Sequence, residues 1–128
     1  MFDKSYEDRL AVWREFREDL ETTFDPLQKV IDFYNQAPRV SIHTDPWDEN
    51  TWPSPWELIN ENQYCDFTRV LGMCYSLQLT ERFKHSKFEI HISTENNLGY
   101  LYLLFIDNFV IGWDDNSYVK KDDLPAVS

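Results

Sequence analysis

The sequence predicts an α+β domain, and three observations support this. Up to about residue 83, apolar residues recur every three or four positions, the period of a helix with one buried face. From residue 88 the period changes to two, as in strands, and Asp107-Asn108 separates two apolar runs as a hairpin turn does. Helices followed by antiparallel strands are typical of an α+β fold.

The length of 128 residues favours a single domain, because it is near the commonest domain size. Hydrophobic residues make up 42 % and aromatic residues 16 %, which is enough for a packed core. We expect a helical N-terminal part over residues 1–50, a core over residues 51–115 and an irregular tail over residues 116–128.

Two helices are predicted before residue 39. Residues 5–22 form the first, with Ser5 as a possible N-cap. The second begins at Asp25 and Pro26, which suit the N-cap and the first turn, and it ends before Pro38. Their apolar stripes are Tyr6, Leu10, Trp13, Phe16 and Leu20, and Leu27, Val30, Ile31 and Tyr34. The following "RVSIH", residues 39–43, predicts a short strand.

Turn-forming residues fill the segment "TDPWDENTWPSP", residues 44–55. A capping box of Ser54 and Glu57, with Pro55 between them, starts a third helix. The longest helix is predicted over about residues 64–83. One side of it carries only small residues, which suits a helix pressed against a sheet; they are Cys65, Thr68, Gly72 and Ser76.

Strands are predicted from residue 88 onward. The first alternates, with Phe88, Ile90 and Ile92 on one face and Glu89, His91 and Ser93 on the other. Next, "YLYLLFI" over residues 100–106 is a nearly continuous apolar run, as in a central strand. After the turn, "FVIGW" forms the other arm of the hairpin.

The formal charge of −11 predicts that the protein does not bind nucleic acid, because phosphate binding needs a cationic surface. A protein or peptide is the expected partner, and one with a basic surface could be attracted by the charge. The simpler interpretation is that acidity keeps the protein soluble. A third is an acidic mimic of nucleic acid, which would require carboxylates arranged along one surface.

Several further classes are excluded by absent patterns. No apolar run approaches the roughly 18 residues that span a membrane, and the N-terminus lacks the apolar segment of a signal peptide. We therefore expect a cytoplasmic protein. Glycine-rich phosphate loops and metal-ligand spacings of any strength are missing, so no cofactor and no metal are expected.

Cys65 and Cys74 are the two cysteines. On one helix they would stand about 13 Å apart along the axis, beyond the reach of a disulfide. We expect free thiols, as in a reducing compartment.

A catalytic site is suggested by the order Cys65, His91, Asp107. A thiol at a helix N-terminus is favoured as thiolate. A histidine on a neighbouring strand could take its proton, and a carboxylate on the next strand could orient the imidazole. Each residue also has a simpler interpretation: a small core residue, a solvated side chain and a turn former, respectively.

The same residues resemble the transglutaminase-like branch of papain-type folds, and more narrowly the bacterial transglutaminase-like cysteine proteinases. The resemblance covers about residues 51–110. Its motif positions are Trp52, Ser54, Pro55, Glu57, Leu58, Ile59, Cys65, Asp66 and Phe67, followed by His91 and by Ile106, Asp107 and Asn108. It implies a nucleophile, base and orienter at Cys65, His91 and Asp107, acting on an amide or peptide bond. Gln63 and Tyr64 stand where the family has Gly-Asp, a departure that concerns catalysis more than the fold.

The competing hypothesis is a non-catalytic acidic interaction protein. Trp47, Trp52 and Trp56 lie in or beside the long loop, and exposed tryptophans are good interface anchors. They could instead pin the loop to the domain. The overall residue pattern, especially in "PWELINENQYCDF" and "SLQLTERF", is also similar to that of small uncharacterised proteins of large tailed phages of marine cyanobacteria. That resemblance implies a virion component or a factor acting in the host cytoplasm. The oligomeric state is open.

Overall fold

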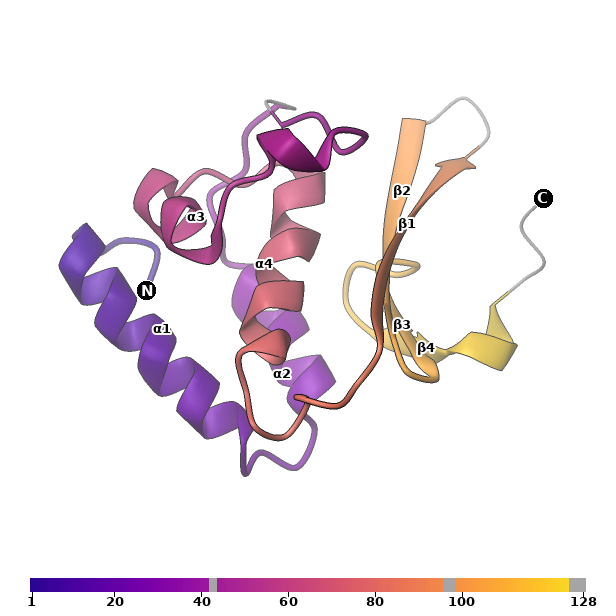
Figure 1. The fold of residues 1–128 in the computed structure, drawn as a ribbon, viewed down its shortest axis with the longest axis horizontal. Coiled ribbons are helices and arrows are strands. Elements are labelled where there is room, and N and C mark those ends of the chain that lie inside the picture. Colours follow the sequence, from indigo (N-terminus) through magenta and orange to yellow (C-terminus); the bar gives the residue numbers. More distant parts are fainter. Residues whose placement is uncertain (42–43, 96–98, 125–128) are drawn as a thin grey trace.

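A layer of helices packs against one face of an antiparallel sheet (Figure 1). The computed structural model describes residues 1–41, 44–95 and 99–124. Within them the elements are α1 (Tyr6–Leu20), α2 (Pro26–Tyr34), the 3-10 turn η1 (Glu49–Thr51), α3 (Pro55–Glu61), α4 (Asp66–Gln78), β1 (Phe88–Glu95), β2 (Gly99–Ile106), β3 (Phe109–Ile111), β4 (Tyr118–Lys120) and the 3-10 turn η2 (Lys121–Asp123). The predicted α+β class is confirmed.

Three helices begin where the sequence predicts. The side chains of Ser5 and Asp25 accept hydrogen bonds from backbone N–H groups of the first turns of α1 and α2. At α3 the capping box is complete, because Ser54 accepts from the N–H of Glu57 and Glu57 accepts from the N–H of Ser54. The predicted strand over residues 39–43 lies partly outside the described residues, and Arg39 makes one parallel bridge with Tyr64.

The central helix α4 has a small-residue face, as predicted, but at Gly72 and Ser76 this face packs against α1 and α2 and not against the sheet. A Cβ atom on Gly72 would stand 2.6 Å from Cε1 of Tyr34. The hydroxyl of Ser76, one turn further, accepts from Trp13 Nε1 and pairs with the Tyr34 hydroxyl, each at 2.9 Å. The small residues therefore admit large aromatic rings from α1 and α2.

The helix α4 ends at Gln78, five residues before the predicted end. Residues 81 and 82 contact the end of α1 instead: the Glu21 carboxylate accepts from the N–H groups of Glu81 and Arg82, both at 2.9 Å. The Arg82 guanidinium donates to the carbonyl oxygens of Leu20 and Thr23. These tertiary hydrogen bonds replace the helical ones that the periodicity predicts.

The sheet has the order β1-β2-β3-β4, with all neighbours antiparallel. Its inner face, which packs on α4, carries Tyr102, Leu104 and Ile106. Its outer face carries the alternate residues. At the β2–β3 hairpin Asp107 has a φ of +51°, so the two-residue turn is confirmed.

The tail is more ordered than predicted. Residues 118–120 form β4, paired with β3, and η2 follows. The tail is also tied to α2: the Tyr118 hydroxyl donates to Asp25 Oδ1 at 3.0 Å, and Gln28 Nε2 donates to the carbonyl of Asn116 at 2.7 Å. A three-residue strand carries too few alternations to be recognised from sequence.

One hydrophobic core joins the helices to the inner face of the sheet. Its largest fully buried side chains include Trp13, Tyr34, Tyr64, Phe67, Leu71 and Leu104. Both cysteines are buried and free, as predicted. No helix in the described residues has the length and apolarity needed to cross a bilayer.

Candidate functional site

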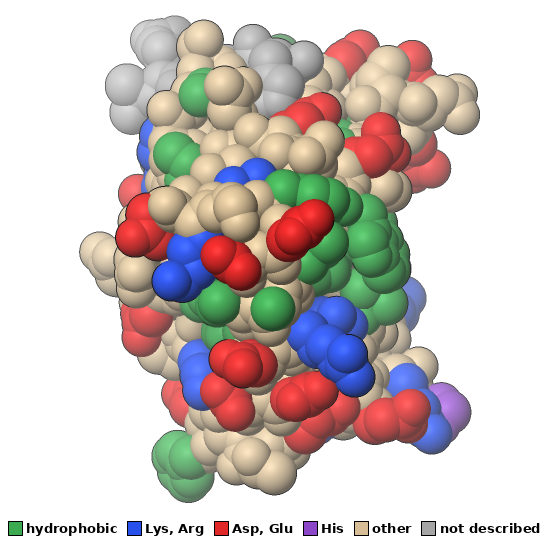
Figure 2. Space-filling view, turned by 90° about the vertical axis from the view of Figure 1, so that its left-hand side faces the viewer, with side chains coloured by type: hydrophobic (Ala, Val, Ile, Leu, Met, Phe, Trp, Pro, Cys, Tyr) green, Lys and Arg blue, Asp and Glu red, His purple; other side chains and the backbone are tan. Residues whose placement is uncertain are grey.

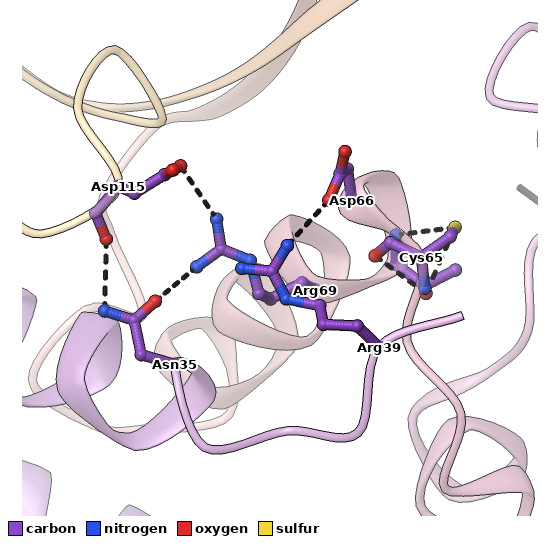
Figure 3. A network of polar contacts seen from close by, with 7 residues as sticks. Asn35, Arg39, Cys65, Asp66, Arg69 and Asp115 are labelled. Carbon is purple, nitrogen blue, oxygen red and sulfur yellow. Dashed lines mark hydrogen bonds and ion pairs between the residues drawn. The ribbon is translucent and has the colours of Figure 1, made fainter. Parts of the chain in front are cut away.

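The Cys65 thiol serves as the N-cap of α4. Its Sγ accepts from the N–H of Thr68 at 3.4 Å, and the Thr68 hydroxyl accepts from the N–H of Cys65 at 2.9 Å. The pair forms a capping box in which the thiol takes the usual place of a serine hydroxyl (Figure 3). Cys65 is 0 % exposed. The predicted position at a helix start is confirmed, and the thiol faces the core.

His91 lies on the outer face of the sheet. Its Nε2 is 2.9 Å from Glu89 Oε2, and its ring lies over Phe105 with 4.3 Å between centroids. Lys87 Nζ is 3.0 Å from the other oxygen of Glu89. These hydrogen bonds, the one from His91 first, lower the pKa of Glu89 to about 2. The imidazole is therefore paired with a carboxylate, but not with the predicted Asp107.

Asp107 acts on the hairpin itself. Its Oδ1 accepts from the N–H of Lys87 at 2.9 Å, and its own N–H donates to the Lys87 carbonyl at 3.0 Å. It thereby closes the end of the β1–β2 ladder in a left-handed conformation. This agrees with the turn-forming interpretation of the residue.

The structure does not bring the three predicted catalytic side chains together. Successive side chains of a strand point to opposite faces, and Ile90 and Ile92 belong to the inner face with the core. His91 therefore points away from α4, whereas Cys65 lies beneath the inner face. The sheet separates thiol from imidazole, and no hydrogen bond among the described residues joins Cys65, His91 and Asp107.

Near Cys65, two arginines form a polar network that joins α2, α4 and the β3–β4 loop (Figure 3). Arg69 Nη1 donates to Asn35 Oδ1 at 2.7 Å and its Nη2 donates to Asp115 Oδ1 at 3.4 Å. Arg39 Nη1 pairs with Asp66 Oδ1 at 2.7 Å. Burial lowers the pKa of Arg69, and the neighbouring positive charge of Arg39 adds to this effect. Both guanidinium groups have carboxylate partners. We therefore interpret the network as a structural clamp that holds α2, α4 and the β3–β4 loop together.

The three tryptophans of the predicted binding loop point in different directions. Trp52 is half-buried, packs on Phe67 at 5.0 Å between ring centroids, and donates from Nε1 to the carbonyl of Asp45 at 3.3 Å. Trp47 is 66 % exposed and lies edge-on to Tyr100 of β2. Trp56 is 51 % exposed and lies edge-on to Trp13 of α1. Trp47 and Trp52 thus border the sheet, and Trp56 borders the opposite helix.

A groove of about 510 Å³ runs between α4 and β1. Its walls come from η1, the loop after it, α4 and β1, and the lining residues are Glu49, Trp52, Leu71, Cys74, Tyr75, Gln78, Phe88, Glu89, Ile90 and His91. Burial raises the pKa of the Cys74 thiol to about 12. A thiol that stays protonated cannot act as a nucleophile, so the groove offers contact surface and not thiol chemistry.

The sequence does not predict this groove. Its apolar lining residues Leu71, Cys74, Phe88 and Ile90 belong to stripes that periodicity assigns to the core, and its polar lining residues are Glu49, Gln78, Glu89 and His91. Alternation predicts the strand that contains the half-buried Phe88 and Ile90. The pattern does not show whether this strand lies at the centre or at the edge of a sheet, and only an edge strand can border a groove.

Comparison with protein-family models, curated proteins and solved structures gave no match to this chain, so the resemblance to transglutaminase-like proteinases stays a prediction.

Proposed function

We propose that the protein is a non-catalytic, acidic interaction module that binds a basic segment of a partner protein. The binding face consists of Trp47, Trp52 and the groove between α4 and β1. The observation that carries the proposal is an ordered aromatic loop placed directly beside an open groove that is lined by both apolar and polar side chains.

The loop is held in place before any partner arrives. Asp45 Oδ1 accepts from the N–H of Trp47 at 2.9 Å, and Asp48 Oδ1 accepts from the N–H of Asn50 at 3.1 Å. Below it, the Tyr75 hydroxyl donates to the carbonyl of Pro53 at 2.6 Å. A preorganised surface loses little conformational entropy on binding, so more of its contact energy becomes affinity.

Charge selects the kind of partner. Between Arg39 and Arg69 the chain carries six acidic residues and neither Lys nor Arg. Three of them, Asp45, Asp48 and Glu49, lie in the loop beside the groove. The face formed by α1 is different, because acidic side chains there are interspersed with Lys and Arg (Figure 2). A basic segment is therefore attracted to the loop side.

The thiol-protease hypothesis is supported less well. It needs a thiol and an imidazole within hydrogen-bonding reach, and here they lie on opposite sides of a sheet. The capping bonds of Cys65, the carboxylate partner of His91 and the turn position of Asp107 each give these residues a structural role.

A selection with a yeast-displayed library of random dodecapeptides tests the proposal. We expect enriched peptides to carry net positive charge and at least one large apolar residue. Their affinity should fall about tenfold or more in Trp47→Ser, the loss typical of an aromatic anchor. Trp56→Ser is the matched control, since Trp56 is similarly exposed on the other side of α4. No enrichment, enrichment without positive charge, or equal effects of both variants would refute the proposed function.

A further inference from the structure

Among the residues that the structure describes, no strand pairs with the outer side of β1, which is therefore an open edge of the sheet. It pairs with β2 on one side, and β4 occupies the other end of the strand order. Exposed edges are usually blunted by lysine, proline or a bulge. Over its eight residues, "FEIHISTE", β1 has neither lysine nor proline, and its register with β2 is continuous. The edge is therefore available for pairing with another strand.

One hydrogen bond shows which backbone groups face the open edge. The N–H of Asp107 donates to the carbonyl of Lys87, so Lys87 points toward β2. Backbone groups alternate sides along a strand, and the β1–β2 register has no break. Glu89, His91 and Ser93 therefore bond to β2, whereas the N–H and C=O groups of four residues face outward: Phe88, Ile90, Ile92 and Thr94.

The residues with outward backbone groups also carry the inner-face side chains. Phe88 and Ile90 line the groove, opposite Leu71, Cys74 and Tyr75 of α4. Phe88, Ile90 and Ile92 are each only half-buried. A strand placed on this edge would direct alternate side chains over them and into the groove.

We propose that an extended basic peptide binds here as an additional strand on β1, an inference that rests on the proposed function and specifies its mode of binding. Main-chain hydrogen bonds to the outward groups of Phe88, Ile90 and Ile92 supply affinity, and alternate apolar side chains fill the groove. The intervening residues are Lys or Arg.

The charges beside the edge favour this occupant. Glu49 stands on the groove side, in the acidic loop with Asp45 and Asp48. On the outer face Glu89 already pairs with Lys87 and His91, so the charge that attracts a basic peptide comes from the groove side. A second copy of the protein could offer the same edge, but both copies carry a charge of −11, which opposes their pairing.

The test uses the tightest fluorescein-labelled dodecapeptide from the display selection. Each of its backbone nitrogens is methylated in turn, which removes one hydrogen-bond donor and leaves the side chain in place. Strand addition predicts a period of two along the peptide's paired segment: methylation at every second position weakens binding about tenfold or more, and methylation between has little effect.

Amide exchange on the protein gives the second readout. Before binding, the N–H groups of Ile90 and Ile92 should exchange fast and those of His91 and Ser93 slowly. The peptide should slow the exchange of Ile90 and Ile92 about tenfold or more. On the protein side, Ile90→Pro should bind more weakly than Ile90→Ala, because both remove the side chain and only proline removes the outward N–H.

The outcomes separate the two proposals. A basic peptide that binds in a Trp47-dependent manner, but shows no period of two and no protection of Ile90 and Ile92, refutes strand addition and leaves the proposed function standing. Absence of any selected peptide refutes both. Protection of the outward amides that rises with protein concentration alone would identify a second copy as the occupant and overturn the inference.

Discussion

The two sides of α4 treat polar groups in opposite ways. At its N-terminal end, the Cys65 thiol and two of the three Arg69 nitrogens bond to neighbours within the fold, while Arg69 Nε has no partner among the described residues. Along the groove, the outward N–H and C=O groups of β1 depend on solvent or a partner. Cys65, His91 and Asp107, the residues with the most reactive side chains, have structural roles. The candidate binding surface instead offers backbone groups and ordinary apolar side chains. Reactive residue types are therefore a poor guide to the functional face of this protein.

The largest expected effect concerns the accessibility of Cys65. In a Cys74→Ala background, iodoacetamide should alkylate Cys65 about 1000-fold or more slowly in the native protein than in the unfolded chain, because the thiol must be exposed by unfolding. Mass spectrometry of timed samples measures the rate. Adding His91→Ala should not change it. Fast native alkylation that is lost with His91 would restore the catalytic hypothesis.

The clamp formed by Arg69 is expected to matter next. Arg69→Ala should lower the free energy of unfolding by about 2–3 kcal/mol, since it removes a buried side chain and its bonds to Asn35 and Asp115. Arg39→Ala is the control, with an expected loss below about 1 kcal/mol, because the Arg39–Asp66 pair is partly exposed. Urea denaturation measures both. Equal losses would contradict the assignment of Arg69 as the structural member.

The close approach at Gly72 should give a smaller loss. Gly72→Ala gains about 1 kcal/mol of helix propensity, but its Cβ meets the Tyr34 ring at 2.6 Å. That ring is fully buried and its hydroxyl is bonded to Ser76, so overpacking should prevail with a net loss of about 1–2 kcal/mol. Thermal and urea unfolding measure it. Tyr34→Leu should remove the penalty, and an additive double variant would argue against the contact.

The smallest effect is the pH dependence at Glu89. Its pKa is held below the usual 4.5, so its pairing stabilises the fold above that value and is lost as the pH falls toward 2. In His91→Ala the pKa should rise toward its usual value, because the hydrogen bond from His91 is the largest cause of the shift. Carboxyl-carbon NMR titration measures this. If the pKa of Glu89 rose more in Lys87→Ala than in His91→Ala, Lys87 and not His91 would be the main cause of the shift.

Local signals in the sequence were sufficient for the starts of the helices. Ser5, Asp25 and Ser54 cap the helices predicted for them, and Asp107 forms the predicted turn. These features depend on neighbours within four residues, so a single sequence contains the relevant physics. The helix end at Gln78 depends on the hydrogen bond between Glu81 and Glu21, which are sixty residues apart, and could not be predicted in that manner.

The candidate site shows the same division. Alternation correctly placed His91 with Glu89, on the face opposite Ile90. The pattern does not show on which face of the sheet α4 lies. That face alone decides whether Cys65 can meet His91. The groove likewise depends on which strand is left unpaired, a property of topology and not of any residue.

The ties between the tail and α2 have a consequence for how the chain is made. Tyr118 meets Asp25 across 93 residues, and Asn116 meets Gln28 across 88. Closing such long loops is slow. During synthesis all four helices leave the ribosome before the sheet that covers Phe67 and Leu71. The nascent chain therefore presents an uncovered apolar surface, and it should depend on chaperones more than the finished protein does.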